Sequence, residues 1–236
     1  MNREFYGVIV GFSTLFFLLS FKFITLLGVC ILSFFVAKEL KDISQSKTNV
    51  FLAPFIALIS IYNISYGFLA IFLAVFLELL ITKDLESFYK SFFILVLSTA
   101  LPEYVYKVKT LGNYYILGLL LGVWILDTMS YYVGKNFGKR KLAPEISPNK
   151  TIEGFIGGSL SCIIFNIFYF GFSRGIIIGI AVSIVGVFGD LFKSLIKRQY
   201  NVKDFSNVFG PHGGFLDRFD ALMFSSLVFY TINAPH

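Results

Sequence analysis

Long apolar runs separated by short polar stretches form the main pattern of this chain. Nine such segments lie near residues 5–21, 24–38, 50–62, 64–82, 91–102, 113–133, 153–172, 175–192 and 220–233. The longer ones match the length of helix that spans a hydrocarbon core of roughly 30 Å. Alternating strands of about ten residues, typical of an outer-membrane barrel, are absent. The pattern predicts an all-α, polytopic membrane protein with about nine transmembrane helices in one bundle.

The third and fifth segments are shorter than the others, and we expect them to tilt, to pack inside the bundle or to span the membrane only in part. The sequence shows no internal repeat and no linker. We therefore expect one integral-membrane domain over residues 1–236. Within it, residues 1–112 form less characteristic helices and residues 113–236 form the half that carries the motifs.

Composition agrees with this class of protein. Charged residues make up 14% of the chain, against about 25% in a typical soluble domain. The two cysteines, Cys30 and Cys162, lie inside apolar runs and are interpreted as small buried hydrophobic residues.

The basic residues predict the topology. With the N-terminus in the cytoplasm and the segments alternating, 16 of the 20 Lys and Arg residues fall on the inner side. The positive-inside rule favours this orientation. It places the charged stretches 134–152 and 193–219 at the cytoplasmic face and the C-terminus outside. Because the net charge of +6 reflects mostly this asymmetry, it does not indicate nucleic-acid binding.

Carboxylates at the ends of the late segments are the first sign of chemistry. Asp127 and Asp190 lie near the predicted inner ends of the sixth and eighth segments, and Asp217 and Asp220 stand three apart at the start of the ninth. Carboxylates near membrane depth are costly unless they are paired, and they usually mark function. The alternatives for each are a helix cap or an interfacial charge.

Basic residues and glycines surround these carboxylates. Lys193, Lys197, Arg198, Lys203 and Arg218 suit phosphate. Gly213 and Gly214 allow a close backbone approach, and carboxylate oxygens suit Mg²⁺. Together these are the parts of a metal-assisted phosphoryl or nucleotidyl transfer site, although a solvated loop is the alternative.

Helix geometry adds a prediction about the metal. If the eighth and ninth segments are antiparallel neighbours, their inner ends lie about 8–10 Å apart. We therefore expect Asp190 and Asp217 to bind the same metal ion, with Asp220 available to a second cation or a water molecule.

The stretch between the sixth and seventh segments repeats the theme. Lys139, Arg140 and Lys141 form a basic group, and Ser147 and Pro148 follow. Ser147 is expected to cap the seventh helix with Pro148 at its first position, which would make a ready anion site. An ordinary cap in a basic inner loop is the alternative.

Two blocks of the sequence resemble the signature of the phosphatidate cytidylyltransferases, also called CDP-diacylglycerol synthases. The block from Ser194 to Asp220 contains Ser-x-x-Lys-Arg, Lys-Asp, His-Gly-Gly and Asp-Arg-x-Asp elements in the family's order. The block from Asp127 to Gly154 contains Gly-Lys-Arg-Lys-Leu and Ser-Pro-Asn-Lys-Thr-Ile-Glu-Gly. The first hundred residues match mainly in hydropathy.

The resemblance implies that CTP and phosphatidic acid react to give CDP-diacylglycerol and pyrophosphate with Mg²⁺ or Mn²⁺ and room for a second cation. It implies a multi-pass protein of the inner membrane with its site facing the cytoplasm; a homodimer stays open. The implied catalytic residues are Asp190, Asp217, Asp220, Lys197 and Arg198, and the three aspartates are also the implied metal ligands. The implied substrate-binding residues are Asp127, Lys139, Lys141, Ser147, Asn149, Lys150, Thr151, Ser194, Lys203, His212, Gly213, Gly214 and Arg218.

Three other functions remain in view. One is a related cytidylyltransferase that acts on an ether-linked isoprenoid lipid phosphate and makes CDP-archaeol. Another is an organic-phosphate transporter, although transporter sites usually lie at the membrane midplane on broken helices. The third is an inactive scaffold, which the complete set of motif residues disfavours.

Overall fold

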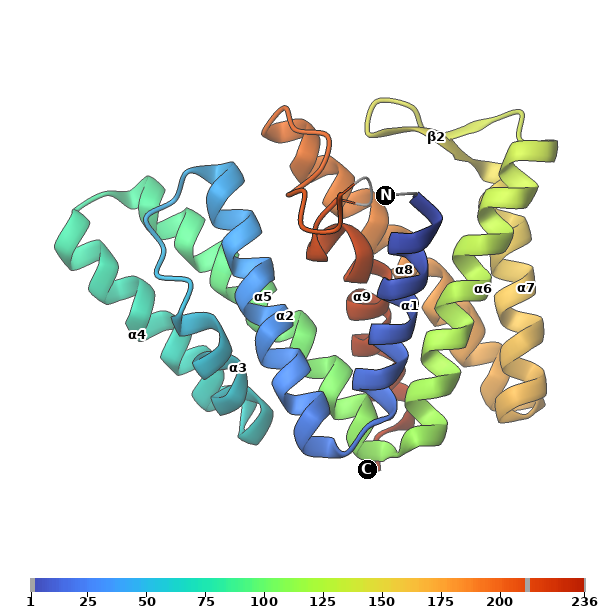
Figure 1. The fold of residues 1–236 in the computed structure, drawn as a ribbon, viewed down its shortest axis with the longest axis horizontal. Coiled ribbons are helices and arrows are strands. Elements are labelled where there is room, and N and C mark those ends of the chain that lie inside the picture. Colours follow the sequence, from blue (N-terminus) through green and yellow to red (C-terminus); the bar gives the residue numbers. More distant parts are fainter. Residues whose placement is uncertain (1–2, 211–212, 236) are drawn as a thin grey trace. The chain divides into compact units, whose positions relative to one another are not determined.

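The computed structural model describes residues 3–210 and 213–235 and is almost entirely helical (Figure 1). Within that part of the chain there are nine helices and one two-stranded sheet. The helices are α1 (Arg3–Leu19), α2 (Lys22–Ser44), α3 (Leu52–Tyr62), α4 (Ile64–Thr82), α5 (Leu85–Leu111), α6 (Asn113–Phe137), α7 (Ile152–Phe170), α8 (Phe172–Gln199) and α9 (Phe215–Asn233). The strands are β1 (Lys141–Ala143) and β2 (Ser147–Thr151), which pair antiparallel.

The predicted all-α class and the nine apolar segments are confirmed. Six of the described helices, α2 and α4 to α8, are long and apolar enough to cross a membrane. The remaining three differ in kind: α1 has 17 residues, α3 has 11, and α9 has three charged residues in its first two turns. The protein is therefore a membrane protein with several membrane-spanning helices.

The fifth segment is much longer than its apolar run of 91–102 indicates. Helix α5 extends from Leu85 to Leu111 and contains Pro102. Charged residues that interrupt the hydropathy form ion pairs one turn apart, Lys90 with Glu86 at 2.7 Å and Lys107 with Glu103 at 2.8 Å. Pairs with this spacing support a helix, so the charges extend α5 rather than end it.

The chain forms two compact units. Unit 1 contains Met1–Thr110 and Val202–Arg218, and unit 2 contains Leu111–Asn201 and Phe219–His236. The first turn of α9 therefore belongs to unit 1 and the rest of that helix to unit 2.

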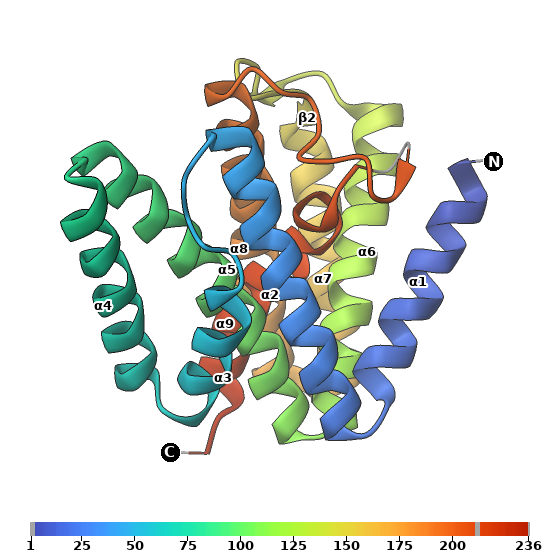
Figure 2. The same ribbon diagram turned by 60° about the vertical axis from the view of Figure 1, so that its left-hand side comes forward.

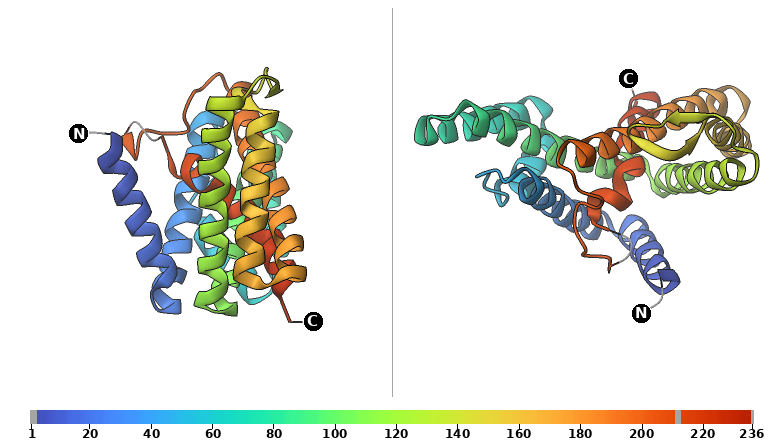
Figure 3. Two further views of the ribbon diagram at one scale, coloured as in Figure 1. Left: turned by 90° about the vertical axis from the view of Figure 1, so that its right-hand side faces the viewer. Right: turned by 90° about the horizontal axis from the view of Figure 1, so that it is seen from above.

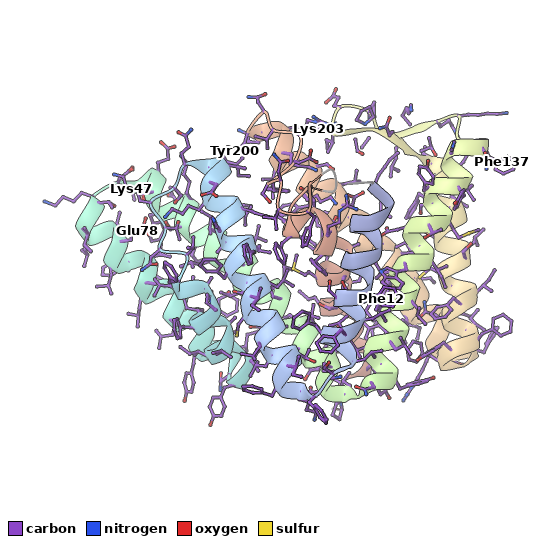
Figure 4. All side chains as sticks on the ribbon, viewed as in Figure 1. Phe12, Lys47, Glu78, Phe137, Tyr200 and Lys203 are labelled. Carbon is purple, nitrogen blue, oxygen red and sulfur yellow. The ribbon has the colours of Figure 1, made fainter. Side chains whose placement is uncertain are left out.

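In unit 1, α3 packs against α2 and α4 (Figure 2). The core residues Val36, Ala37 and Leu40 of α2 are almost completely buried. Helix α4, in contrast, exposes a series of large apolar side chains: Phe68, Leu69, Phe72, Leu73, Phe76, Leu77, Leu80 and Ile81. A helix that is apolar on its exposed side suits contact with lipid tails; Phe12 on α1 is likewise exposed (Figure 4).

In unit 2, α7 packs between α6 and α8 (Figure 3). Glycine allows a close approach between α6 and α7, because a Cβ atom on Gly154 would lie 2.7 Å from the carbonyl oxygen of Ser130 and 3.0 Å from the Cα of Gly134. Helix α9 packs on α8 through Phe224, whose ring contacts those of Phe188 and Phe192. This packing fixes where α6, α8 and α9 present their polar residues.

Candidate functional site

Lys193 on α8 joins two carboxylates. Its Nζ atom lies 3.0 Å from Oδ1 of Asp190, one turn earlier on the same helix, and 2.8 Å from Oδ2 of Asp220 on α9. The side chains of Lys193 and Asp220 are only 12% and 6% exposed, so these charges interact with little screening by water. Two carboxylates from two helices thus converge on one cationic group.

Two further residues complete this group. Lys150 on β2 forms an ion pair with Oδ2 of Asp190. Asp127 on α6 lies within electrostatic range of both aspartates and both lysines, and it is exposed. We call Asp127, Lys150, Asp190, Lys193 and Asp220 the acid–lysine cluster. All five lie in unit 2, and they come from four different elements.

The last turns of α8 carry residues that were predicted in a loop. Ser194 donates its hydroxyl to the backbone oxygen of Asp190 at 2.8 Å. Arg198 donates Nε–H to the backbone oxygen of Ile146 in the β1–β2 hairpin at 3.3 Å. Lys197 lies on the same turn. The helix therefore places the Arg198 side chain against the hairpin that supplies Lys150.

The β1–β2 hairpin differs from the predicted structure at Ser147. This residue begins β2 and does not cap a helix, because residues 147–151 pair with 141–143 as a strand. Helix α7 begins at Ile152, and its cap is Thr151, whose hydroxyl accepts a hydrogen bond from Gly154 N at 3.1 Å. The prediction of a cap at Ser147 is wrong by four residues. Among the predicted substrate-binding residues of this region, Lys139, Lys141 and Asn149 are exposed.

Glu153 fixes the backbone just before the β1–β2 hairpin. Its Oε2 atom accepts hydrogen bonds from the backbone N–H groups of Lys139 and Arg140 at 3.0 and 3.1 Å, and its Oε1 atom accepts from Nε–H of Arg140 at 3.1 Å. The sequence motif contained this glutamate but gave no indication of its role.

Asp217 has a different environment from Asp190 and Asp220. It lies in unit 1, where its Oδ2 atom accepts hydrogen bonds from the backbone N–H groups of Phe205 at 2.9 Å and Gly214 at 3.1 Å. Gly213 has a φ of +77°, and a Cβ atom there would lie 2.6 Å from that same carboxylate oxygen. The observed position of the Asp217 carboxylate therefore requires glycine at position 213, because any larger residue would overlap it.

The other predicted residues of this segment also lie in unit 1. Lys203 and Arg218 are exposed and Gly214 is buried; Lys203 is labelled in Figure 4. His212 lies outside the described residues. The predicted set of three metal-binding aspartates is thus found as a pair in unit 2 and one residue in unit 1.

The donor set bears on the expected metal ion. In the described part of the chain, no group of three or more His, Cys, Asp or Glu side chains is arranged around one ion position. The carboxylates of Asp190 and Asp220 nevertheless converge on one cationic atom, and their hard oxygens are the ligands that Mg²⁺ favours. The chemistry of the cluster fits a divalent cation.

Sequence reasoning missed Glu39. This residue of α2 is 3% exposed and accepts hydrogen bonds from three groups in residues 206–216. In the sequence it lies among charged residues at the end of an apolar run, where it resembles an ordinary interfacial charge.

Comparison with known proteins gives consistent matches. Residues 1–234 match the model of the cytidylyltransferase family. The chain is 42% identical to a phosphatidate cytidylyltransferase of Aquifex aeolicus, over 98% of this chain and 90% of that protein. It is 46% identical to the phosphatidate cytidylyltransferase of Staphylococcus haemolyticus, over 51% of this chain and 49% of that protein. It is 39% identical to the phosphatidate cytidylyltransferase of Bacillus subtilis, over 52% of this chain and 49% of that protein.

Proposed function

The chain belongs to the cytidylyltransferase family, and we propose that it transfers a cytidylyl group from CTP to phosphatidic acid, giving CDP-diacylglycerol and pyrophosphate. The relative that matches over nearly the whole chain carries the name of this enzyme. The observation that carries the proposal is the acid–lysine cluster, because it combines converging carboxylates with lysines on a membrane protein. Such a site suits the meeting of a charged nucleotide with a lipid that stays in the bilayer.

The reaction needs charge control more than a strong base. An oxygen of the lipid phosphate attacks the α-phosphorus of CTP and forms a new P–O bond, while the bond from that phosphorus to the α–β bridging oxygen breaks and pyrophosphate leaves. The attacking phosphate is already ionised near neutral pH. Both reactants are anions, so cationic groups must reduce their repulsion and stabilise the charge that develops on the leaving pyrophosphate.

We assign this task to basic residues around the cluster. Lys150 and Lys193 belong to it, and Lys197 and Arg198 lie on the adjoining turns of α8. Asp190 and Asp220 hold the two lysine ammonium groups in place. The lysines are thereby positioned before the phosphates arrive, which lowers the cost of binding them.

We further propose that the cluster takes a divalent cation, Mg²⁺ or Mn²⁺, through Asp190 and Asp220, with Asp127 nearby. A bound divalent cation supplies Lewis-acid stabilisation of phosphate charge. The earlier prediction that Asp190 and Asp217 share one ion stays a prediction.

An assay with radiolabelled CTP and phosphatidic acid in detergent micelles tests the function. We expect label in the lipid extract in proportion to time and enzyme, release of pyrophosphate, loss of both on chelation of divalent cations, and recovery with Mg²⁺ or Mn²⁺. Ether-linked isoprenoid phosphate serves as the comparison substrate. If neither lipid acquires label although the protein is folded, the chain is not a lipid cytidylyltransferase.

The orientation of the site is a separate proposal. We place the cluster and residues 138–151 at the cytoplasmic side of the inner membrane, because CTP is supplied there and because 16 of the 20 basic residues fall on that side in the predicted topology. A single cysteine replacing Glu145, an exposed residue of the hairpin turn, in a chain with Cys30 and Cys162 replaced by Ala, should react with an impermeant maleimide only after cells are opened. Labelling in intact cells with a permeable outer membrane would indicate that the hairpin faces the periplasm, which is the opposite orientation.

A further inference from the structure

Glu39 on α2 binds the start of α9. Its Oε1 atom accepts hydrogen bonds from the hydroxyl of Ser206 at 2.6 Å and from Phe215 N at 2.8 Å, and its Oε2 atom accepts from Leu216 N at 2.9 Å. All of these groups belong to unit 1. A carboxylate that is 3% exposed thus uses both oxygens on one short segment of chain.

These contacts satisfy groups that α9 cannot satisfy itself. Phe215 and Leu216 are the first two residues of the helix, and the first N–H groups of any helix lack partners within it. The preceding residue is Gly214, which has no side chain to act as a cap. A negative charge at a helix N-terminus also interacts favourably with the helix dipole. Glu39 therefore supplies the cap from another helix.

A second carboxylate completes the arrangement. Asp217 accepts from Phe205 N and Gly214 N, so the two acids bind groups of adjacent residues, Phe205 with Ser206 and Gly214 with Phe215. We call the described residues of this stretch, 205–210 and 213–216, the capped segment. Between its ends the chain turns tightly, with Gly210 N donating to Asn207 O at 2.9 Å.

Packing brings α2 and the capped segment together at the same place. Phe35, one turn before Glu39, stacks on Phe215 with ring centroids 4.4 Å apart. Gly214 lies so close to Glu39 that an added Cβ atom would overlap its carboxylate oxygen. The surfaces of α2 and the capped segment are therefore complementary in shape as well as in hydrogen bonding.

We propose that Glu39 is a positioning residue for the reaction: it fixes the backbone of the capped segment and, through it, the direction of the Asp217 carboxylate. The proposal rests on the proposed function, because its consequence is measured in turnover. Asp217, Gly213 and Gly214 belong to the set that the family resemblance implicates in catalysis and substrate binding. Glu39 does not touch the reactants itself.

The test compares Glu39→Ala with Glu78→Ala. Glu78 is a matched control in the same unit, because it lies on α4 and accepts hydrogen bonds from the hydroxyls of Ser87 and Ser91, both at 2.7 Å (Figure 4). We expect Glu39→Ala to lower kcat per folded molecule by about 100-fold, the cost of a displacement of roughly 1 Å at a catalytic group. Glu78→Ala should leave kcat and the KM values for CTP and lipid near those of the unmodified chain.

Two readouts separate positioning from general stabilisation. Amide hydrogen exchange should become faster in the capped segment of Glu39→Ala and stay unchanged there in Glu78→Ala. Glu39→Gln should recover part of the lost kcat, because its carbonyl oxygen can still accept from Ser206 and Phe215. If folded Glu39→Ala turns over as fast as Glu78→Ala, or if exchange in the capped segment does not change, the proposal is wrong. If the unmodified chain shows no CTP turnover, the proposed function is wrong. Amide hydrogen exchange in Glu39→Ala would still show whether Glu39 holds the capped segment in place.

Discussion

Asp190→Asn and Asp220→Asn each lower CTP-dependent formation of labelled lipid by about 100- to 1,000-fold, the range for removing one preorganised electrostatic group from an active site. The reason is the shared ammonium group of Lys193, which lies 3.0 Å from one carboxylate and 2.8 Å from the other. Removing either negative charge lets the lysine turn towards the remaining aspartate. It also removes an oxygen donor from the proposed cation site.

Glu145→Gln is the control, because it removes one negative charge from an exposed position of the hairpin turn. Turnover is measured with saturating CTP, lipid and Mg²⁺, on protein that elutes as a single species in detergent. Near-normal turnover by both aspartate variants would remove the acid–lysine cluster from the mechanism.

Asp217→Asn provides an informative comparison. An Asn side chain keeps one oxygen that can accept from Phe205 N and Gly214 N, as Asp217 Oδ2 does. The capped segment should therefore keep its structure while the charge is lost. A fall in turnover without faster amide exchange in the capped segment would show that the charge itself matters at this position.

Most of the fold was predictable from hydropathy, because in lipid every backbone polar group must be satisfied within a helix or closed barrel. All nine apolar segments became helices. The length of α5 was not predicted, since its charged ends lower the hydropathy while ion pairs such as Lys90 with Glu86 stabilise the helix. Hydropathy measures transfer to lipid, and it does not register such pairs.

Part of the site was also predictable. The family resemblance and the carboxylates near the ends of apolar segments singled out Asp127, Asp190 and Asp220, because an ionisable group near membrane depth needs a partner. The structure brings the three together, and their roles in the reaction stay predictions. The cap at Ser147 was predicted wrongly, since Ser-Pro is a common helix start but here residues 147–151 form a strand with Thr151 as the cap.

The features that could not be predicted from the sequence depend on contacts between residues far apart in the chain or on the neighbours of each side chain. Glu39 and Leu216 lie far apart in the chain, and only the folded structure brings them within hydrogen-bonding distance. Asp217 and Asp220 are three residues apart, yet one binds backbone N–H groups of a loop and the other an ammonium group of α8. Spacing along a helix predicts a shared face, but the neighbours on that face decide what each carboxylate does.

Lys193→Met should destabilise the protein by about 3 kcal/mol, because removing one partner of a buried ion pair leaves charge uncompensated. Met keeps the apolar stem and the approximate volume of Lys while removing the charge. Asp220, whose side chain is 6% exposed, then lies near Asp190 without the intervening ammonium group. The measurement is the midpoint of thermal unfolding in detergent with a chelator present, so that no divalent cation can replace the lysine.

The double variant Lys193→Met/Asp220→Asn identifies the cause. Removing the opposing charge should restore most of the lost stability, because the charge left uncompensated is then gone, while CTP-dependent turnover stays at or below the low level of Asp220→Asn. Lys90→Met is the matched control: it breaks the pair with Glu86, whose side chain is 74% exposed, and exposed pairs contribute about 0–1 kcal/mol. If the double variant is no more stable than Lys193→Met alone, the two residues are not energetically coupled and the lysine stabilises the fold by another route. If it recovers both stability and turnover, Lys193 and Asp220 serve only to hold the helices together, and the phosphate chemistry must be assigned to other basic residues such as Lys150 and Arg198.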